Sequence, residues 1–192
     1  MFGGNKMRID VILFMLVVLT ILGCNSFQPV EVLPDDFELY YEDSAMHLEW
    51  GQDILEIDTE NNAAYTQKKG SGMEMISEFN IEEEKLLEIY NKALENNFFG
   101  LQNNYEDPTI MDGGIQVIEI KGQGASKKVT LVNYYMYELD TLSSMILNLV
   151  PQEMRDRKFN DLCPEKMTEC SNDNSEVCTE WVHYCEDEGN KE

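Results

Sequence analysis

The sequence predicts an α+β fold: an antiparallel β-sheet, a meander plus a hairpin, with two helices packed on one face, followed by a small disulfide-rich tail. Three observations carry this prediction. Apolar and polar residues alternate in several short consecutive runs, two later segments repeat apolar residues at helical spacing, and four cysteines fall within the last 30 residues. Consecutive strands favour an antiparallel meander over alternating β-α-β units.

The strands are indicated by alternation, which places one side of each strand on a core and the other in water. Thr59–Asn62 lies between two of these runs and has the asparagine content of a hairpin loop. A later hairpin is expected at Ile115–Ile120 and Lys128–Val132, joined by a glycine-containing turn. The meander strands are expected at Phe37–Tyr41, Met46–Trp50, Asp53–Asp58, Ala64–Gln67 and Met73–Phe79.

Two helices are expected, one on each side of the later hairpin. Asn80 followed by Glu83 forms a capping signal for the first helix, which ends near Asn96. The second covers Glu138–Leu149 and is stopped by Pro151. Their apolar stripes are Leu86, Leu87, Tyr90, Ala93 and Leu94 in the first, and Leu139, Leu142, Met145, Ile146 and Leu149 in the second.

The N-terminus has the order of a secretory signal peptide. Lys6 and Arg8 supply positive charge, the apolar run Val11–Leu22 follows, and Gly23 stands directly before Cys24. The apolar run is shorter than the roughly 20 residues that a membrane-spanning helix needs. The sequence therefore favours cleavage over a permanent membrane span.

Ile21-Leu22-Gly23-Cys24 resembles the lipobox of prokaryotic lipoproteins. The resemblance implies that the Cys24 thiol carries diacylglycerol and that residues 1–23 are removed as a signal peptide. It implies a protein anchored by lipid to the cell membrane or envelope, on the extracytoplasmic side. Residues 24–36, which include Pro29 and Pro34, are then expected to form a lipidated tether. The alternative is a signal peptide cut elsewhere, with Cys24 an ordinary thiol.

Charge limits the partners of the remaining chain, which is expected to form a globular domain over residues 37–151 and a Cys-rich acidic tail over 152–192. The formal net charge of the whole sequence is −23, which disfavours nucleic acid and anionic headgroups. Divalent metals, basic peptides or a cationic wall polymer are compatible with this charge. The alternative is that the acidity only maintains solubility.

Cysteine usage agrees with export. An even set of four cysteines in an exported chain predicts two disulfides, with three possible pairings. A zinc site that includes His183 is the alternative, but the set lacks the close cysteine pairs of zinc fingers. No cofactor is expected. The four cysteines are Cys163, Cys170, Cys178 and Cys185.

Residues 48–151 resemble an uncharacterised domain of exported prokaryotic lipoproteins. The resemblance rests on the hairpin from Ile54–Asp58 to Tyr65, on Asn97–Leu101, on the loop from Tyr105 to Asp112 and Gly113, and on Lys128 and Val129. It implies a fold of this kind and carries no activity with it.

The loop Gln102–Gly114 is the candidate binding site of the domain, because it is long for a connection and carries Asp107 and Asp112. Its carboxylates suit a hard cation, but their spacing departs from an EF-hand and an ordinary turn is favoured. No serine has the context of a nucleophile, and His47 and His183 lie far apart. A non-enzymatic role is therefore expected, with an envelope hydrolase as a weaker hypothesis.

The tail offers a second candidate, since Trp181 and Tyr184 lie between Cys178 and Cys185 in what the sequence suggests is a small closed loop. This segment resembles the first half of a Kazal-type protease inhibitor. The resemblance implies an extracellular protease inhibitor as the alternative to a binding or envelope-maintenance role. The competing structural prediction is that the two aromatics form a miniature core around the disulfides or dock on the domain.

Overall fold

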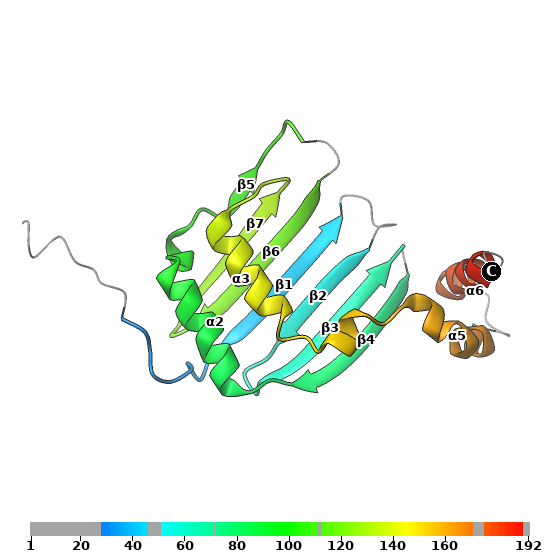
Figure 1. The fold of residues 1–192 in the computed structure, drawn as a ribbon, viewed down its shortest axis with the longest axis horizontal. Helices are drawn as coiled ribbons and strands as arrows, with labels where there is room; N and C mark the ends of the chain where they lie inside the picture. The colour runs from blue at the N-terminus through cyan, green and yellow to red at the C-terminus, as the bar shows by residue number, and fades with distance from the viewer. Residues whose placement is uncertain (1–27, 46–50, 71, 111–112, 171–174, 190–192) are drawn as a thin grey trace, which may run out of the picture.

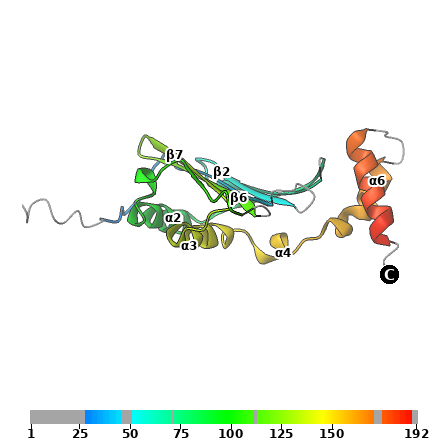
Figure 2. The same cartoon turned by 90° about the horizontal axis from the view of Figure 1, so that it is seen from above.

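The structure is a computed structural model that describes residues 28–45, 51–70, 72–110, 113–170 and 175–189. It confirms the α+β fold. One seven-stranded sheet, in the order β4-β3-β2-β1-β6-β7-β5, forms a layer, and the described helices of the domain lie against one of its faces (Figure 1, Figure 2). The other face, called the open face below, carries no helix among the described residues.

The strands follow the predicted order. The hairpin of β6 and β7 joins the meander through β1, where Leu39 pairs with Ile120. The short β5 pairs with β7 in parallel and was not predicted. The expected strand at Met46–Trp50 lies outside the described residues. The strands are β1 Glu38–Ala45, β2 Gln52–Ile57, β3 Asn62–Lys69, β4 Met73–Asn80, β5 Asn104–Glu106, β6 Gly114–Gly122 and β7 Ala125–Val132.

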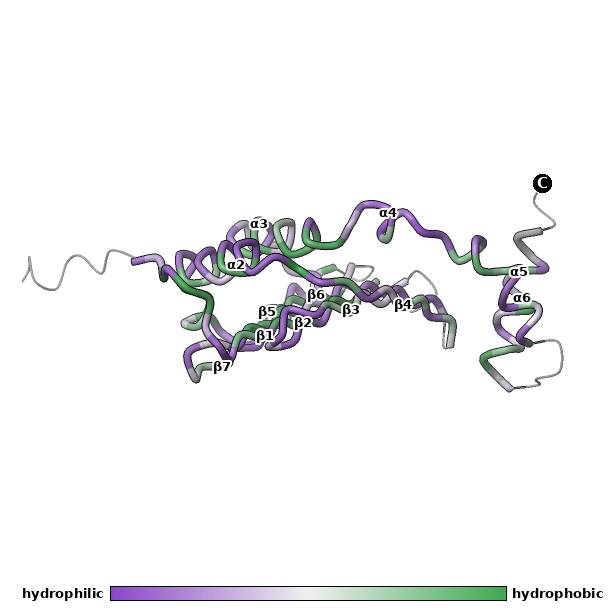
Figure 3. Tube along the Cα trace, turned by 90° about the horizontal axis from the view of Figure 1, so that it is seen from below, coloured by the Kyte–Doolittle hydropathy of each residue, from purple (hydrophilic) through white to green (hydrophobic). Residues whose placement is uncertain are grey.

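The period of two along the strands builds the core. Leu39 and Tyr41 on β1, with Leu55 and Ile57 on β2, are buried beneath the helices, while residues between them are polar or partly exposed. Figure 3 shows the same alternation as changes between green and purple along the strand traces.

Helix α2 (Glu83–Glu95) and helix α3 (Tyr137–Leu147) cover the sheet. The stripe of α2 buries Leu86, Ile89, Tyr90 and Ala93, each at most 1 % exposed. Burying an aliphatic or aromatic side chain of this size contributes about 1.5–3 kcal/mol, so the packing outweighs the weak propensity of an isolated helix. The 3-10 turn η2 (Phe98–Gly100) then adds Phe98 to the core.

The predicted start of the first helix is wrong. Asn80 is the last residue of β4, and its side-chain amide donates to Asn62 Oδ1 at 2.7 Å instead of capping α2. The N-cap is Glu82, which makes no side-chain capping bond. The predicted end is confirmed at Asn96, after which Asn97 adopts a positive φ of 52° that turns the chain away.

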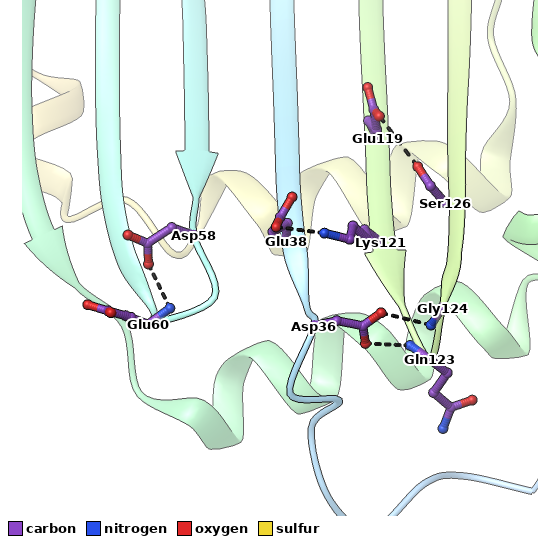
Figure 4. Close-up of polar contacts among 9 residues, drawn as sticks. All are labelled: Asp36, Glu38, Asp58, Glu60, Glu119, Lys121, Gln123, Gly124 and Ser126. Atoms are coloured by element: carbon purple, nitrogen blue, oxygen red, sulfur yellow. Dashed lines mark hydrogen bonds and ion pairs between the residues drawn. The ribbon is translucent and has the colours of Figure 1, made fainter.

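Residues 30–36 pack on the domain, which corrects the expected tether over 24–36. Val30 N–H donates to Asn91 Oδ1 at 2.8 Å, and Asn91 Nδ2 donates back to Val30 C=O at 3.0 Å. Leu33 is 8 % exposed. Asp36 accepts hydrogen bonds from the backbone N–H groups of Gln123 and Gly124, at 2.7 Å each, in the turn between β6 and β7 (Figure 4).

The tail is helical and contains two disulfides. Cys163 is bonded to Cys185 and Cys170 to Cys178, so the four predicted disulfide cysteines are confirmed and one of the three open pairings is selected. A hydrophilic connection through α4 leads to it (Figure 3). Its elements are α4 Gln152–Arg155, η3 Phe159–Leu162, α5 Cys163–Glu169 and α6 Glu176–Gly189.

A second, smaller core holds the tail at the end of the hairpin of β3 and β4. Trp181 is 3 % exposed and packs with both Cys170 and Cys178, and with Met73 at the start of β4. Lys69 Nζ lies 4.4 Å from the centroid of the Tyr184 ring, a cation-π contact between the domain and the tail. No helix among the described residues has the length and apolar character needed to cross a membrane.

Candidate functional site

A pocket of about 600 Å³ lies at the ends of the central strands and includes the predicted loop; we call it the distal pocket. It forms where β1 ends, β6 begins, and the chain leaves β7 for α3. This is the strand end opposite the turn of Gln123 and Gly124 (Figure 1). The residues that line it are Asp43, Asp107, Ile110, Gly113, Gly114, Ile115, Gln116, Leu131, Asn133, Tyr134, Tyr135, Met136 and Asp140.

Asp107 organises one rim of the distal pocket. Its Oδ1 accepts the Thr109 hydroxyl at 2.6 Å and the Thr109 N–H at 2.9 Å, which is an Asx turn. These hydrogen bonds from Thr109 stabilise the charged carboxylate and hold the pKa of Asp107 below its usual value. Asp107 lines the distal pocket, within the loop predicted as the candidate binding site. Asp112, the other residue predicted in this loop, lies outside the described residues.

Asn133 joins the two rims. It has a positive φ of 54°, its N–H donates to Gly114 C=O at 2.9 Å, and its Nδ2 donates to Ile110 C=O at 2.8 Å. A Cβ atom at Gly113 would overlap the Asn133 side chain, so any larger residue at this position would displace that side chain. The Asn133 side chain therefore fixes the loop after β5 against the end of β7.

Two tyrosines form the aromatic wall. Tyr134 is 42 % exposed and stacks at a tilt on Tyr105, with 5.5 Å between ring centroids. Tyr135 is 70 % exposed, and its hydroxyl donates to Asp140 Oδ2 at 3.4 Å. Sequence reasoning missed both residues. The signal that could have found them is the run Tyr134-Tyr135-Met136-Tyr137, which places three large aromatics between a strand and a helix.

The inner part of the distal pocket is polar. Gln116 donates from Nε2 to the Tyr41 hydroxyl at 3.3 Å and accepts from the Ser143 hydroxyl at 3.0 Å.

Asp43 is exposed to the pocket, but neighbouring protein atoms displace part of the water around its carboxyl. This desolvation, with the charge of Asp53 on β2, raises the pKa of Asp43 above its usual value, and a hydrogen bond from Tyr41 partly offsets the rise.

The charged residues known to line the distal pocket are acidic. Asp43, Asp107 and Asp140 line it, and none of the described lining residues is a lysine, arginine or histidine. Such a lining attracts a positively charged group and repels an anion. Within the part of the chain that the structure describes, no three His, Cys, Asp or Glu side chains gather closely enough to hold a metal ion. The carboxylates and the tyrosine rings of the lining suit an organic cation such as an ammonium or guanidinium group.

A larger groove of about 840 Å³ lies on the open face. The two lysines that line this groove form ion pairs with glutamates of the sheet. Lys121 Nζ is 2.8 Å from Glu38 (Figure 4), and Lys128 Nζ is 4.0 Å from Glu119. Tyr40, which lines the groove, donates from its hydroxyl to Glu42 at 2.7 Å. Desolvation, and then this hydrogen bond, raise the pKa of the Tyr40 hydroxyl. This surface is the solvated face expected of an antiparallel sheet.

The tail does not form the predicted reactive loop. Cys178 and Cys185 are not bonded to each other, and the segment between them is part of α6, so the expectation of a small closed loop is wrong. Trp181 is buried and Tyr184 is partly buried beside Phe159, with 6.3 Å between the ring centroids of Tyr184 and Phe159. The competing prediction, a miniature core around the disulfides, is confirmed.

Cys24, the predicted lipidation site, and His47 lie outside the described residues. His183 is exposed on α6, away from the distal pocket. A scan against protein-family models finds no family that matches this chain, and a search of the curated proteins finds no matching sequence.

Proposed function

We propose that this protein is a non-enzymatic, lipid-anchored protein of the cell envelope that binds a cationic partner in the distal pocket. The anchor rests on the lipobox-like segment Ile21–Cys24 behind a signal-like apolar run. The partner is a basic peptide segment, whose lysine or arginine side chain enters the pocket. The observation that carries the binding role is the lining of three carboxylates and two tyrosines, with no basic side chain among the described residues of the pocket.

The chemistry of the pocket accounts for this preference. An ammonium group over an exposed tyrosine ring gains about 0.5–1 kcal/mol, and charge-assisted hydrogen bonds to Asp43 or Asp140 add to it. The carboxylates are partly exposed, so added salt screens them. Binding is therefore expected to weaken with ionic strength.

The anchor is tested by mass spectrometry of the protein extracted from membranes. We expect a mature N-terminus at Cys24 that carries the mass of diacylglycerol. A chain that still contains residues upstream of Cys24, or an unmodified thiol there, would contradict the anchor while leaving the pocket proposal standing.

The binding role is tested by calorimetry of the full chain in detergent, with a lysine-rich peptide and a glutamate-rich peptide of equal length. We expect binding of the first peptide only. Tyr135→Ala removes the exposed wall and should weaken binding by about 1 kcal/mol, roughly fivefold. Tyr137→Ala is the matched control. Tyr137 is 69 % exposed and Tyr135 is 70 % exposed, but Tyr137 does not line the pocket. Equal losses in the two variants would overturn the assignment of the site.

A further inference from the structure

We infer that the anchor holds the domain end-on above the bilayer, with the distal pocket directed away from it, so that the cationic partner arrives from outside the membrane. This inference rests on the lipid at Cys24 that the proposed function includes. It adds the orientation of the site and the side from which the partner approaches.

The first observation is that the chain is fastened to the domain soon after the anchor. The paired hydrogen bonds between Val30 and Asn91 fix residue 30 on α2, and the buried Leu33 and the clamp at Asp36 secure the residues that follow. Only six Cα–Cα steps separate Cys24 from Val30. Whatever their conformation, six steps span at most about 22 Å. The anchored end of the domain therefore stays close to the bilayer.

The second observation is the direction of β1. The strand begins two residues after the Asp36 clamp and ends at Ala45, beside Asp43 in the distal pocket. Eight residues of extended strand cover about 26 Å. Figure 1 shows the blue N-terminal segment and the loop after β5 at opposite ends of the sheet. The pocket is thus at the end of the domain that lies farthest along the strands from the anchor.

The third observation is the charge of the two broad faces. Exposed Glu83, Glu84 and Glu88 lie on α2, and exposed Glu56 and Glu78 lie on the open face. A domain lying flat would bring one of these acidic surfaces against the headgroups, and anionic headgroups would repel it. The end-on orientation avoids this repulsion on both faces.

The test measures energy transfer from a dye on the protein to acceptor lipids in anionic vesicles. Single cysteines are added by Glu60→Cys, in the turn between β2 and β3 at the anchored end, or by Tyr137→Cys, beside the distal pocket. The four tail cysteines are in disulfides and do not compete for the dye. We expect strong transfer from position 60 and loss of most of it at position 137.

A matched control inserts about 20 Gly/Ser residues after Asn25, which adds roughly 25 Å of mean reach. The difference between the two positions should then shrink, because the longer linker frees the orientation. Equal transfer at the two positions in the unextended chain would overturn the inference while leaving the anchor intact. A chain that does not float with the vesicles would overturn the anchor, and the inference with it.

Discussion

Asp43 on β1 and Asp53 on β2 stand directly opposite each other in the antiparallel ladder. Like charges in facing positions of a sheet destabilise it. The Tyr65 hydroxyl donates to Asp53 Oδ1 at 2.8 Å and fixes that carboxylate, whereas Asp43 lines the distal pocket. A cation in the pocket would relieve the repulsion. The negative charge of Asp43 therefore lowers the stability of the free protein and raises its affinity for a cation.

Asp43→Asn should therefore stabilise the fold and weaken binding together. Removing the repulsion is expected to raise stability by less than about 1 kcal/mol, because solvent screens an exposed carboxyl. In a chain of this size that raises Tm by about 2–4 °C at most. Affinity for the lysine-rich peptide should fall about fivefold. Thermal unfolding and calorimetry on one sample check both effects.

Glu74→Gln is the control for Asp43→Asn, since Glu74 is an exposed carboxylate on β4 outside the pocket. It changes the net charge equally and should leave both Tm and affinity nearly unchanged. A lower Tm in Asp43→Asn would mean that the carboxylate stabilises the fold, and it would contradict the proposed repulsion between Asp43 and Asp53.

The pH dependence follows from the raised pKa of Asp43. Its folded-state pKa lies above the ordinary value of 3.8, so the ionised group opposes folding at neutral pH, and this penalty disappears as pH falls through the folded pKa toward 3.8. The Tm advantage of Asp43→Asn should therefore narrow on acidification. Peptide binding should weaken over the same range, because protonation removes the charge. A Tm advantage that is constant from pH 7 to about pH 4 would contradict the assignment.

Much of the fold could be predicted because its signals are local. Alternation in β1 to β4 and the apolar stripe of α2 are set by residues a few positions apart, and each segment has one face to bury. The parallel pairing of β5 depends on three residues meeting β7 across a long separation, which no local pattern encodes. Asn80 has the residue type of a helix N-cap, and the sequence does not show that β4 continues as far as Asn80.

Gly113→Ala should loosen the rim of the distal pocket. The added methyl group displaces the Asn133 side chain and breaks its bond to Ile110 C=O, at a cost of about 1 kcal/mol or more. Peptide affinity should fall as well. The double variant with Asn133→Gly should lose less than the sum of the two single variants, because the overlap is then absent. Strict additivity in urea unfolding would contradict this contact.

The tail should unfold separately from the domain. Its core of Met73, Cys170, Cys178 and Trp181 is distinct from the main core beneath the helices. By loop entropy the Cys163–Cys185 bond contributes about 3 kcal/mol and the Cys170–Cys178 bond about 2.5 kcal/mol. Reduction should abolish hydrogen-exchange protection in α6 while that of β1 and β6 persists. Loss of protection in β1 would contradict two separate cores.

The candidate site was only partly predictable. The loop around Asp107 could be found from its length and carboxylates, but its role depends on contacts with Asn133 and the tyrosine wall, which lie about 25 residues later. The cysteine pairing likewise depends on two helices lying side by side, and sequence spacing alone left three arrangements open. In both regions the missing information is tertiary.

The most direct test of the binding claim is a nuclear magnetic resonance titration of the acylated chain in detergent micelles with the lysine-rich peptide. We expect saturable shifts for the side-chain amides of Gln116 and Asn133 and for the backbone amide of Tyr135. Amides of α6 should not move. Shifts confined to the open face around Tyr40, or no shifts at all, would contradict it.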